Sequence, residues 1–152
     1  MRRFLDALFP IALTAWVGAL WAIGYIAAPV LFAQLADRVV AGTLAGKMFA
    51  VVGWLGMGCG SVLVLLLLRQ GLGALRRWLF WLLLLMLLLS AAQLFGLQPL
   101  IAHLRSESVP RELADAATRS RFATWHGVAS ALYLLQSLLG LVAVLLAGRE
   151  RR

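Results

Sequence analysis

The sequence is poor in cysteine, in acidic residues and in the motifs on which most enzymes depend. Its 152 residues include one cysteine, Cys59, and six aspartates and glutamates in total. A single cysteine excludes an internal disulfide, and there is no cysteine pair that could form a metal site. The sequence also has no nucleophile motif and no glycine-rich phosphate loop. These absences favour a non-enzymatic protein.

Charged residues are scarce too, at 13% of the chain, whereas soluble domains have about 25%. The acidic residues fall in loops or near the chain ends, so an ion-coupled transporter would lack its usual intramembrane carboxylate. The formal net charge is nevertheless +8. Because the basic residues lie at the edges of apolar runs rather than in one patch, they argue against nucleic-acid binding. They indicate contacts with the anionic headgroups of a lipid bilayer.

Hydrophobic residues make up 63% of the chain, more than one small globule can bury. A spanning helix needs about 20 mainly apolar residues, and four segments reach this length, at roughly 9–28, 47–68, 78–101 and 122–147. The first segment is too long for the apolar core of a cleaved secretory signal, which has about 7–15 residues. The sequence therefore predicts an all-α, integral membrane four-helix bundle that forms one domain, residues 1–152. We find no convincing sequence repeat between its halves.

The connection between the first two predicted spans is itself partly apolar. Pro29 is expected to end or kink the first helix. Leu31, Leu35 and Val39 follow it at spacings that suit an amphipathic helix lying in the membrane interface. We expect such an interfacial segment between the first and second spans.

The positions of the basic residues predict an orientation. With four spans, the N-terminus, the second connection and the C-terminus share one side of the membrane. That side holds eight arginines close to span ends: Arg2, Arg3, Arg69, Arg76, Arg77, Arg149, Arg151 and Arg152. The other side holds six basic residues that are interspersed with acidic ones. The positive-inside rule then places both termini in the cytoplasm.

Glycines form a stripe at spacings of three and four along the second predicted span. The stripe consists of Gly42, Gly46, Gly53, Gly56 and Gly60. Such small residues let membrane helices approach each other, so the stripe predicts a helix-packing seam. A dimer interface and a groove that accommodates a cofactor are the alternatives.

Polar residues form a similar stripe on the fourth span, where His126, Ser130 and Tyr133 share one face. Lipid offers them no hydrogen-bond partners, so this face should point into the bundle. The topology places Tyr25 of the first span and Gln93 of the third at a similar depth. We expect these five side chains to form one buried polar cluster, either a network that fixes helix register or a site for a small ligand, a proton or a cofactor.

His126 is the only titratable group well inside a predicted span, which makes it a functional candidate. Histidine can bind haem iron or another metal, or carry a proton. The second histidine, His103, lies near the far end of the third span, and the sequence has no further metal-ligand cluster. We therefore expect no metal and no cofactor. The alternative is a small haem-, metal- or redox-handling membrane protein in which His126 is a ligand.

Two stretches, "GALWAIGYIAAPVLFAQLADRVVAGTLAGKMF" and "RFATWHGVAS", resemble bacterial inner-membrane proteins related to eukaryotic transmembrane protein 205. The residues that carry this resemblance are Gly18, Pro29, Phe32, Gly42, Gly46, Phe49, Phe122, His126, Gly127 and Ser130. The resemblance implies a four-span bundle in the bacterial inner membrane, in a family of unknown function. We therefore favour a membrane module that acts through contacts with lipid, with other membrane proteins or with a second copy of itself.

Overall fold

The computed structural model describes residues 2–70, 73–107 and 116–150, and within these ranges the chain is helical and contains no strand. The helices in chain order are α1 (Arg2–Trp21), η1 (Ala22–Ala27), α2 (Ala28–Gln34), α3 (Arg38–Gln70), α4 (Ala74–Ala91), η2 (Ala92–Leu97), α5 (Gln98–Glu107) and α6 (Ala116–Glu150). Four continuous stretches are long and apolar enough to cross a membrane: Ala7–Gln34, Arg38–Arg69, Arg76–Ser106 and Ala116–Arg149. The all-α, four-span prediction is therefore confirmed, and the chain is a multi-pass membrane protein.

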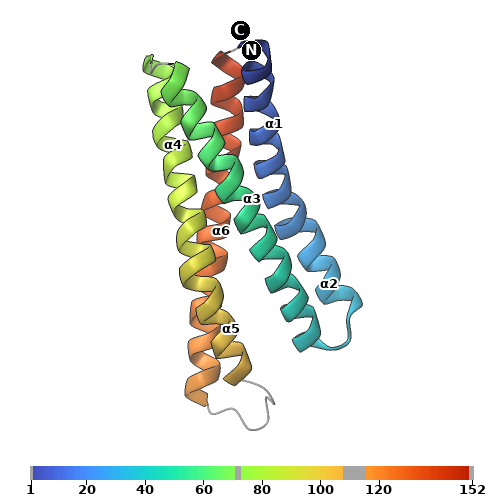
Figure 1. The fold of residues 1–152 in the computed structure, drawn as a ribbon. Helices are drawn as coiled ribbons and strands as arrows, with labels where there is room; N and C mark the ends of the chain where they lie inside the picture. The colour runs from blue at the N-terminus through green and yellow to red at the C-terminus, as the bar shows by residue number, and fades with distance from the viewer. Residues whose placement is uncertain (1, 71–72, 108–115, 151–152) are drawn as a thin grey trace.

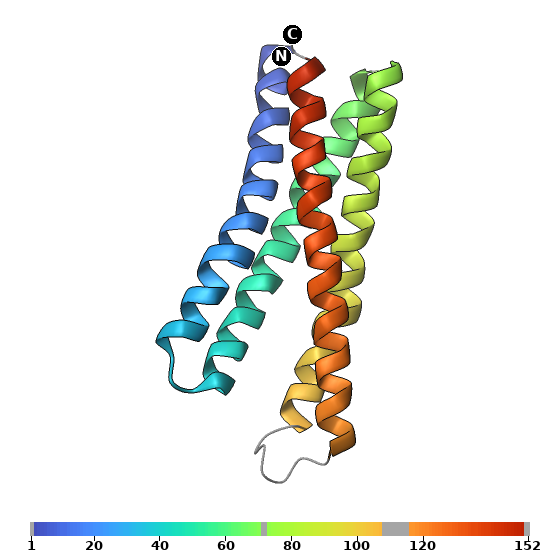
Figure 2. The same ribbon diagram turned by 180° about the vertical axis from the view of Figure 1, so that it is seen from behind.

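The four spans form an antiparallel ring. The first packs on the second, the second on the third, the third on the fourth, and the fourth returns to the first, through the pairs α1–α3, α3–α4, α4–α6 and α1–α6. The start of α1, the end of α3, the start of α4 and the end of α6 all lie at one end of the bundle (Figure 1). We call it the terminal end, and the opposite end the loop end. From behind, the hairpin of α1, α2 and α3 and the hairpin of α4, α5 and α6 diverge towards the loop end (Figure 2).

The packed core lies in the half of the bundle nearer the terminal end. Its largest member is Trp16 of α1, which is fully buried among leucines of α3 and α4 such as Leu63 and Leu83. Outward-facing hydrophobic side chains such as Leu65 and Leu145 are more than half exposed. This distribution suits a bundle that is surrounded by lipid, because the outward-facing leucines then contact acyl chains and expose no apolar surface to water.

The first and third spans each contain one π-helical segment, η1 and η2, and each segment ends two residues before a proline, Pro29 or Pro99. Proline has no N–H to donate, and its ring crowds the carbonyl four residues earlier. Within a membrane the helix meets this demand by a local π adjustment. The two hairpins thus repeat one order of elements, a helix, a π segment, a short helix and a long returning helix, although no sequence repeat was detected.

The structure modifies the expected interfacial segment between the first two spans. Leu31 belongs to α2, which continues the first span, and Val39 already lies in α3. Only residues 35–37 connect the two helices, and the carboxylate of Asp37 accepts hydrogen bonds from the backbone N–H groups of Val39 and Val40 at 2.7 and 3.2 Å. This is an N-cap, which starts α3 directly at the turn. The apolar residues of the segment are therefore divided between two spanning helices instead of forming a separate one.

Candidate functional site

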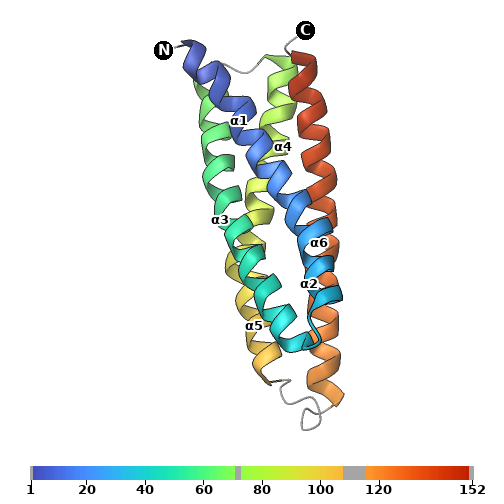
Figure 3. The same cartoon turned by 90° about the vertical axis from the view of Figure 1, so that its right-hand side faces the viewer.

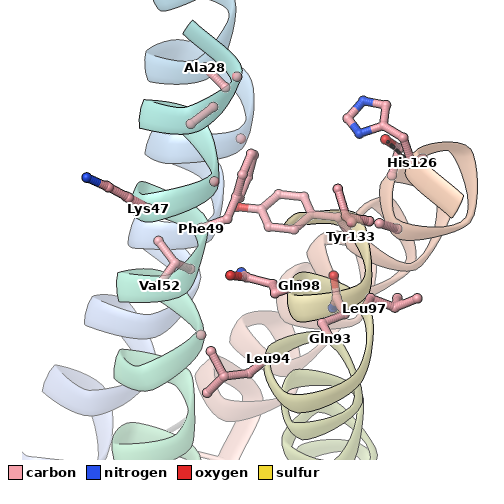
Figure 4. Close-up of a pocket in the computed structure, with 18 of the residues that line it drawn as sticks. Ala28, Lys47, Phe49, Val52, Gln93, Leu94, Leu97, Gln98, His126 and Tyr133 are labelled. Atoms are coloured by element: carbon pink, nitrogen blue, oxygen red, sulfur yellow. Dashed lines mark hydrogen bonds between the residues drawn. The ribbon is translucent and has the colours of Figure 1, made fainter. Parts of the chain in front are cut away.

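A cavity of about 730 Å³ lies between the spans in the half of the bundle nearer the loop end. All four spans line it: the first through η1 and α2, the second through α3, the third through η2 and α5, and the fourth through α6. Its volume lies within the range of about 300–1,000 Å³ that is usual for small-molecule sites. Figure 4 shows side chains from α3, from the third span and from α6 that face one another across this space. Figure 3 gives a side view of the same four spans.

The inner end of the cavity is closed by a chain of three polar side chains from α4, η2 and α6. The amide of Gln93 donates to Oε1 of Gln136 at 2.5 Å, and Nε2 of Gln136 donates to Oγ of Ser90 at 2.6 Å. Gln136 and Ser90 are 2% and 3% exposed. Lipid cannot satisfy these groups, so the three side chains depend on one another. We call them the polar floor.

Aromatic rings form one wall of the cavity, and Tyr133 of α6 is at their centre. Its ring makes edge contacts with Phe49 and Tyr25, at centroid distances of 5.1 and 6.4 Å. Its hydroxyl donates to the backbone carbonyl of Leu20, two residues before η1, at 2.6 Å. This ring also occupies the space beside Gly24, where an added Cβ would collide with it. Tyr133 therefore fixes the fourth span against the interrupted first span.

The guanidinium of Arg105, in the last turns of α5, lies against two glycines of α3. A Cβ added at Gly42 would lie 3.6 Å from Cζ of Arg105, and one at Gly46 would lie 3.3 Å from its Nη1. On another side, Cζ is 6.0 Å from the centre of the Phe122 ring, within cation–π range. Because these two glycines have no side chains, the guanidinium can pack directly on α3 at the edge of the cavity; we call Gly42 and Gly46 the bed of Arg105.

His126 lies at the outer end of the cavity, away from the polar floor (Figure 4). Its ring stacks on Phe122 at 5.8 Å, and the imidazole is exposed. Ser130 lies one turn further along α6, and its hydroxyl donates to the carbonyl of His126 at 2.9 Å. The hydroxyl of Ser130 thus forms its hydrogen bond within α6 and does not link α6 to another helix.

The five residues predicted to cluster, His126, Ser130, Tyr133, Tyr25 and Gln93, all line this one cavity. The structure distributes them over three depths, because only Gln93 belongs to the polar floor, whereas the two tyrosines form the wall and His126 the outer end.

Sequence reasoning missed Gln136 and Arg105. Gln136 is a single amide in a leucine-rich span, a signal that could have identified it. Arg105 was counted only as a loop charge, and nothing in the sequence indicates that it reaches α3.

The other three glycines of the predicted stripe also face side chains of neighbouring helices. A Cβ at Gly53 would lie 3.0 Å from Leu94. Cβ atoms at Gly56 and Gly60 would lie 2.5 and 2.9 Å from atoms of Trp16. The close neighbours of these glycines are large side chains and not helix backbones.

Within the described residues, no group of three or more histidine, cysteine, aspartate or glutamate side chains could hold a metal ion. Of the two histidines, His126 lines the cavity and His103 does not. The haem, metal or redox hypothesis for His126 stays a prediction, and no contact in the described residues favours it.

Residues 11–110 match the model of a protein family whose description is "Domain of unknown function (DUF4149)". No curated protein matches the chain, and no solved structure does. The relation to transmembrane protein 205 that the sequence motifs suggested stays a prediction. The match covers the first three spans and therefore most of the cavity lining, but it carries no activity with it.

Proposed function

Since the chain belongs to the DUF4149 family, a domain of unknown function, its role has to be argued from the cavity, and we propose that it binds a small amphipathic molecule from the membrane there. In this proposal it is a non-enzymatic helical bundle that acts through lipid contacts. The observation that carries the proposal is the cavity itself, about 730 Å³ between four membrane spans, with polar groups at its inner end and near its outer end.

The chemistry of the lining supports an amphipathic ligand. The wall between the polar floor and the outer end is made of apolar and aromatic side chains such as Phe49, Leu94 and Leu97, which suit a hydrocarbon chain. Two lining residues, Tyr25 of η1 and Leu134 of α6, are 46% and 52% exposed. They belong to the first and fourth spans, so a molecule could enter sideways between these spans from the bilayer.

Filling the cavity tests this proposal. Ala129 of α6 lines the cavity, whereas its neighbour Val128 does not and is exposed. We expect Ala129→Phe to remove most of the lipid that stays with the purified protein, and Val128→Phe to leave it unchanged. The measurement is the amount of lipid per protein after extensive detergent washing, determined by mass spectrometry. Equal lipid content in both variants and the unchanged chain would refute ligand binding in the cavity.

We also propose that the protein resides in the bacterial inner membrane with both termini in the cytoplasm. The arginines next to span ends at the terminal end support this orientation through the positive-inside rule. A reporter that is active only in the cytoplasm should be active when fused after Arg152. It should be inactive when inserted into the connection between α5 and α6, and the reverse result would overturn the orientation.

A further inference from the structure

Arg105 has an unusual combination of surroundings for a charged residue. It lies in the last described turns of the third span, partly buried, and lines the cavity. Its contacts are the bed of Gly42 and Gly46 on one side and the Phe122 ring on another. None of these contacts is a carboxylate, and Arg105 forms no ion pair with any residue that the structure describes. A guanidinium in such a place can still bind an anion through its fork of N–H donors.

The other charges near the cavity leave Arg105 as its main anion-binding group. Lys47 borders the cavity, but its ammonium points away from the enclosed space (Figure 4). His126, at the same outer end, points away from the polar floor. The lining contains no aspartate or glutamate. Among the described residues that line the cavity, the charged side chains are thus basic and none is a carboxylate that would repel an anion.

The length of the cavity matches one leaflet of a bilayer. Arg105 and Gln93 of the polar floor are separated by 12 residues of the third span, which corresponds to at most about 18 Å at the α-helical rise of 1.5 Å per residue, because part of this stretch is the π segment η2. The hydrocarbon core of a bilayer is about 30 Å thick, so one leaflet contributes about half of that. A ligand whose head contacts Arg105 and whose tail reaches the polar floor would thus have the length of a lipid in one leaflet.

We propose that the cavity binds a membrane lipid with an anionic phosphate headgroup, which Arg105 holds while an acyl chain enters between the aromatic wall and η2. This inference rests on the proposed function and names the ligand class for the same site. The glycines at positions 42 and 46 then serve the ligand, because they let the guanidinium lie flat with its donors turned to the headgroup. A lipid with a zwitterionic headgroup offers the same phosphate but adds an ammonium group, so its net attraction to Arg105 is weaker.

The test compares the binding of two lipids to variants of two arginines, Arg105 and Arg38. The full chain in detergent is titrated with phosphatidylglycerol or with phosphatidylethanolamine, and bound lipid is counted by native mass spectrometry. Arg105→Gln should weaken phosphatidylglycerol binding about tenfold, in line with a charge-assisted hydrogen bond to phosphate, and should weaken phosphatidylethanolamine binding by a smaller factor, because the ammonium group of that lipid offsets its phosphate charge. Arg38→Gln is the matched control, because Arg38 lies at the same end of the bundle, outside the cavity lining, and donates to the carbonyl of Phe32.

Each outcome decides between the two proposals. Equal affinity of the unchanged chain for both lipids, or an equal loss in Arg38→Gln, would overturn the anionic-headgroup inference. If Ala129→Phe abolishes binding of both lipids while Arg105→Gln alters neither, the inference fails but the cavity proposal stands. If Ala129→Phe alters neither lipid, the cavity proposal fails as well. Inorganic phosphate at the lipid concentration should not displace phosphatidylglycerol, and displacement would assign the site to a free anion.

Should Arg105→Gln fold poorly, Arg105→Lys provides the same decision. Lysine keeps the charge but loses the planar fork, so it should retain a preference for phosphatidylglycerol with reduced affinity. A lysine variant without any preference between the two lipids, but with full cavity binding, would contradict the inference.

Discussion

Helix α3 offers the most demanding test of the packing, because Gly56 of the glycine stripe and Gly58 outside the stripe differ sharply in their surroundings. A Cβ at Gly56 would lie 2.5 Å from Nε1 and 3.1 Å from Cε2 of Trp16, and 3.1 Å from Oγ of Ser90. Trp16 is 0% exposed, and its ring is rigid. At Gly58, two residues along the same helix, a Cβ would meet nothing within 4 Å.

The two alanine substitutions should therefore have opposite signs. Replacing glycine by alanine inside a helix stabilises it by about 0.5–1 kcal/mol, which Gly58→Ala should gain in full. Gly56→Ala gains the same amount but forces a buried indole to move, and overpacking of this kind costs about 1–3 kcal/mol. We use about 3 kcal/mol because the atoms in conflict belong to a ring, which gives a net loss of about 2 kcal/mol for Gly56→Ala.

The assay is reversible unfolding in mixed micelles, followed by tryptophan fluorescence and by far-UV circular dichroism. We expect Gly56→Ala to unfold at a lower denaturant concentration than the unchanged chain, and Gly58→Ala at an equal or higher one. If Gly56→Ala is as stable as Gly58→Ala, Trp16 does not occupy the space against Gly56, and the packing derived for this half of the bundle is wrong.

Two further predictions concern the cavity. Gln136→Leu removes both hydrogen bonds of the polar floor, and at about 0.6 kcal/mol for each bond within a membrane it should cost about 1 kcal/mol; a double-mutant cycle with Gln93→Leu measures the coupling, and zero coupling would contradict the bond between the two amides. Tyr133→Phe should cost about 0.5–1.5 kcal/mol through the lost bond to the Leu20 carbonyl, whereas Tyr25→Phe should be neutral, because the hydroxyl of Tyr25 makes no hydrogen bond within the described residues. Unfolding midpoints that do not separate the two tyrosine variants would refute the role given to Tyr133.

The sequence predicts the spans well because lipid imposes a simple rule, about 20 apolar residues for each crossing. The polar stripe of α6 predicts that His126, Ser130 and Tyr133 face inward; all three line the cavity, but His126 and Ser130 are exposed. It does not predict how deep each residue lies relative to residues of other spans, because depth depends on where each helix begins and how the helices are offset. Gln93 and His126, for example, are expected at a similar depth, but Gln93 pairs with Gln136, ten residues from His126 along α6, so the two lie at different depths.

Arg105 shows a second limit of the sequence. Its charge and its place at the end of a span are typical of a residue in the membrane interface. Because that role already explains an arginine at this position, the sequence gives no reason to expect another one. Its actual surroundings depend on α5 ending opposite Gly42 and Gly46 of α3, which are 63 and 59 positions before Arg105 in the sequence. A pattern of glycines indicates that there is space beside the helix, but it does not show which side chain occupies that space. The stripe is predicted as a seam between helices, and the side chains of neighbouring helices that lie against it are an arginine, a leucine and a tryptophan.

The two halves of the glycine stripe differ in what faces them, and this difference connects the fold with the proposed function. Near the terminal end, Gly56 and Gly60 face Trp16, which fills the bundle and excludes a ligand. Near the loop end, Gly42 and Gly46 face a single long side chain that leaves a cavity beside it. The π segments before Pro29 and Pro99 lie where the packing changes from one kind to the other, and both contribute lining residues. The interruption of the first and third spans thus coincides with the change from a solid core to the cavity in which we propose that a lipid binds.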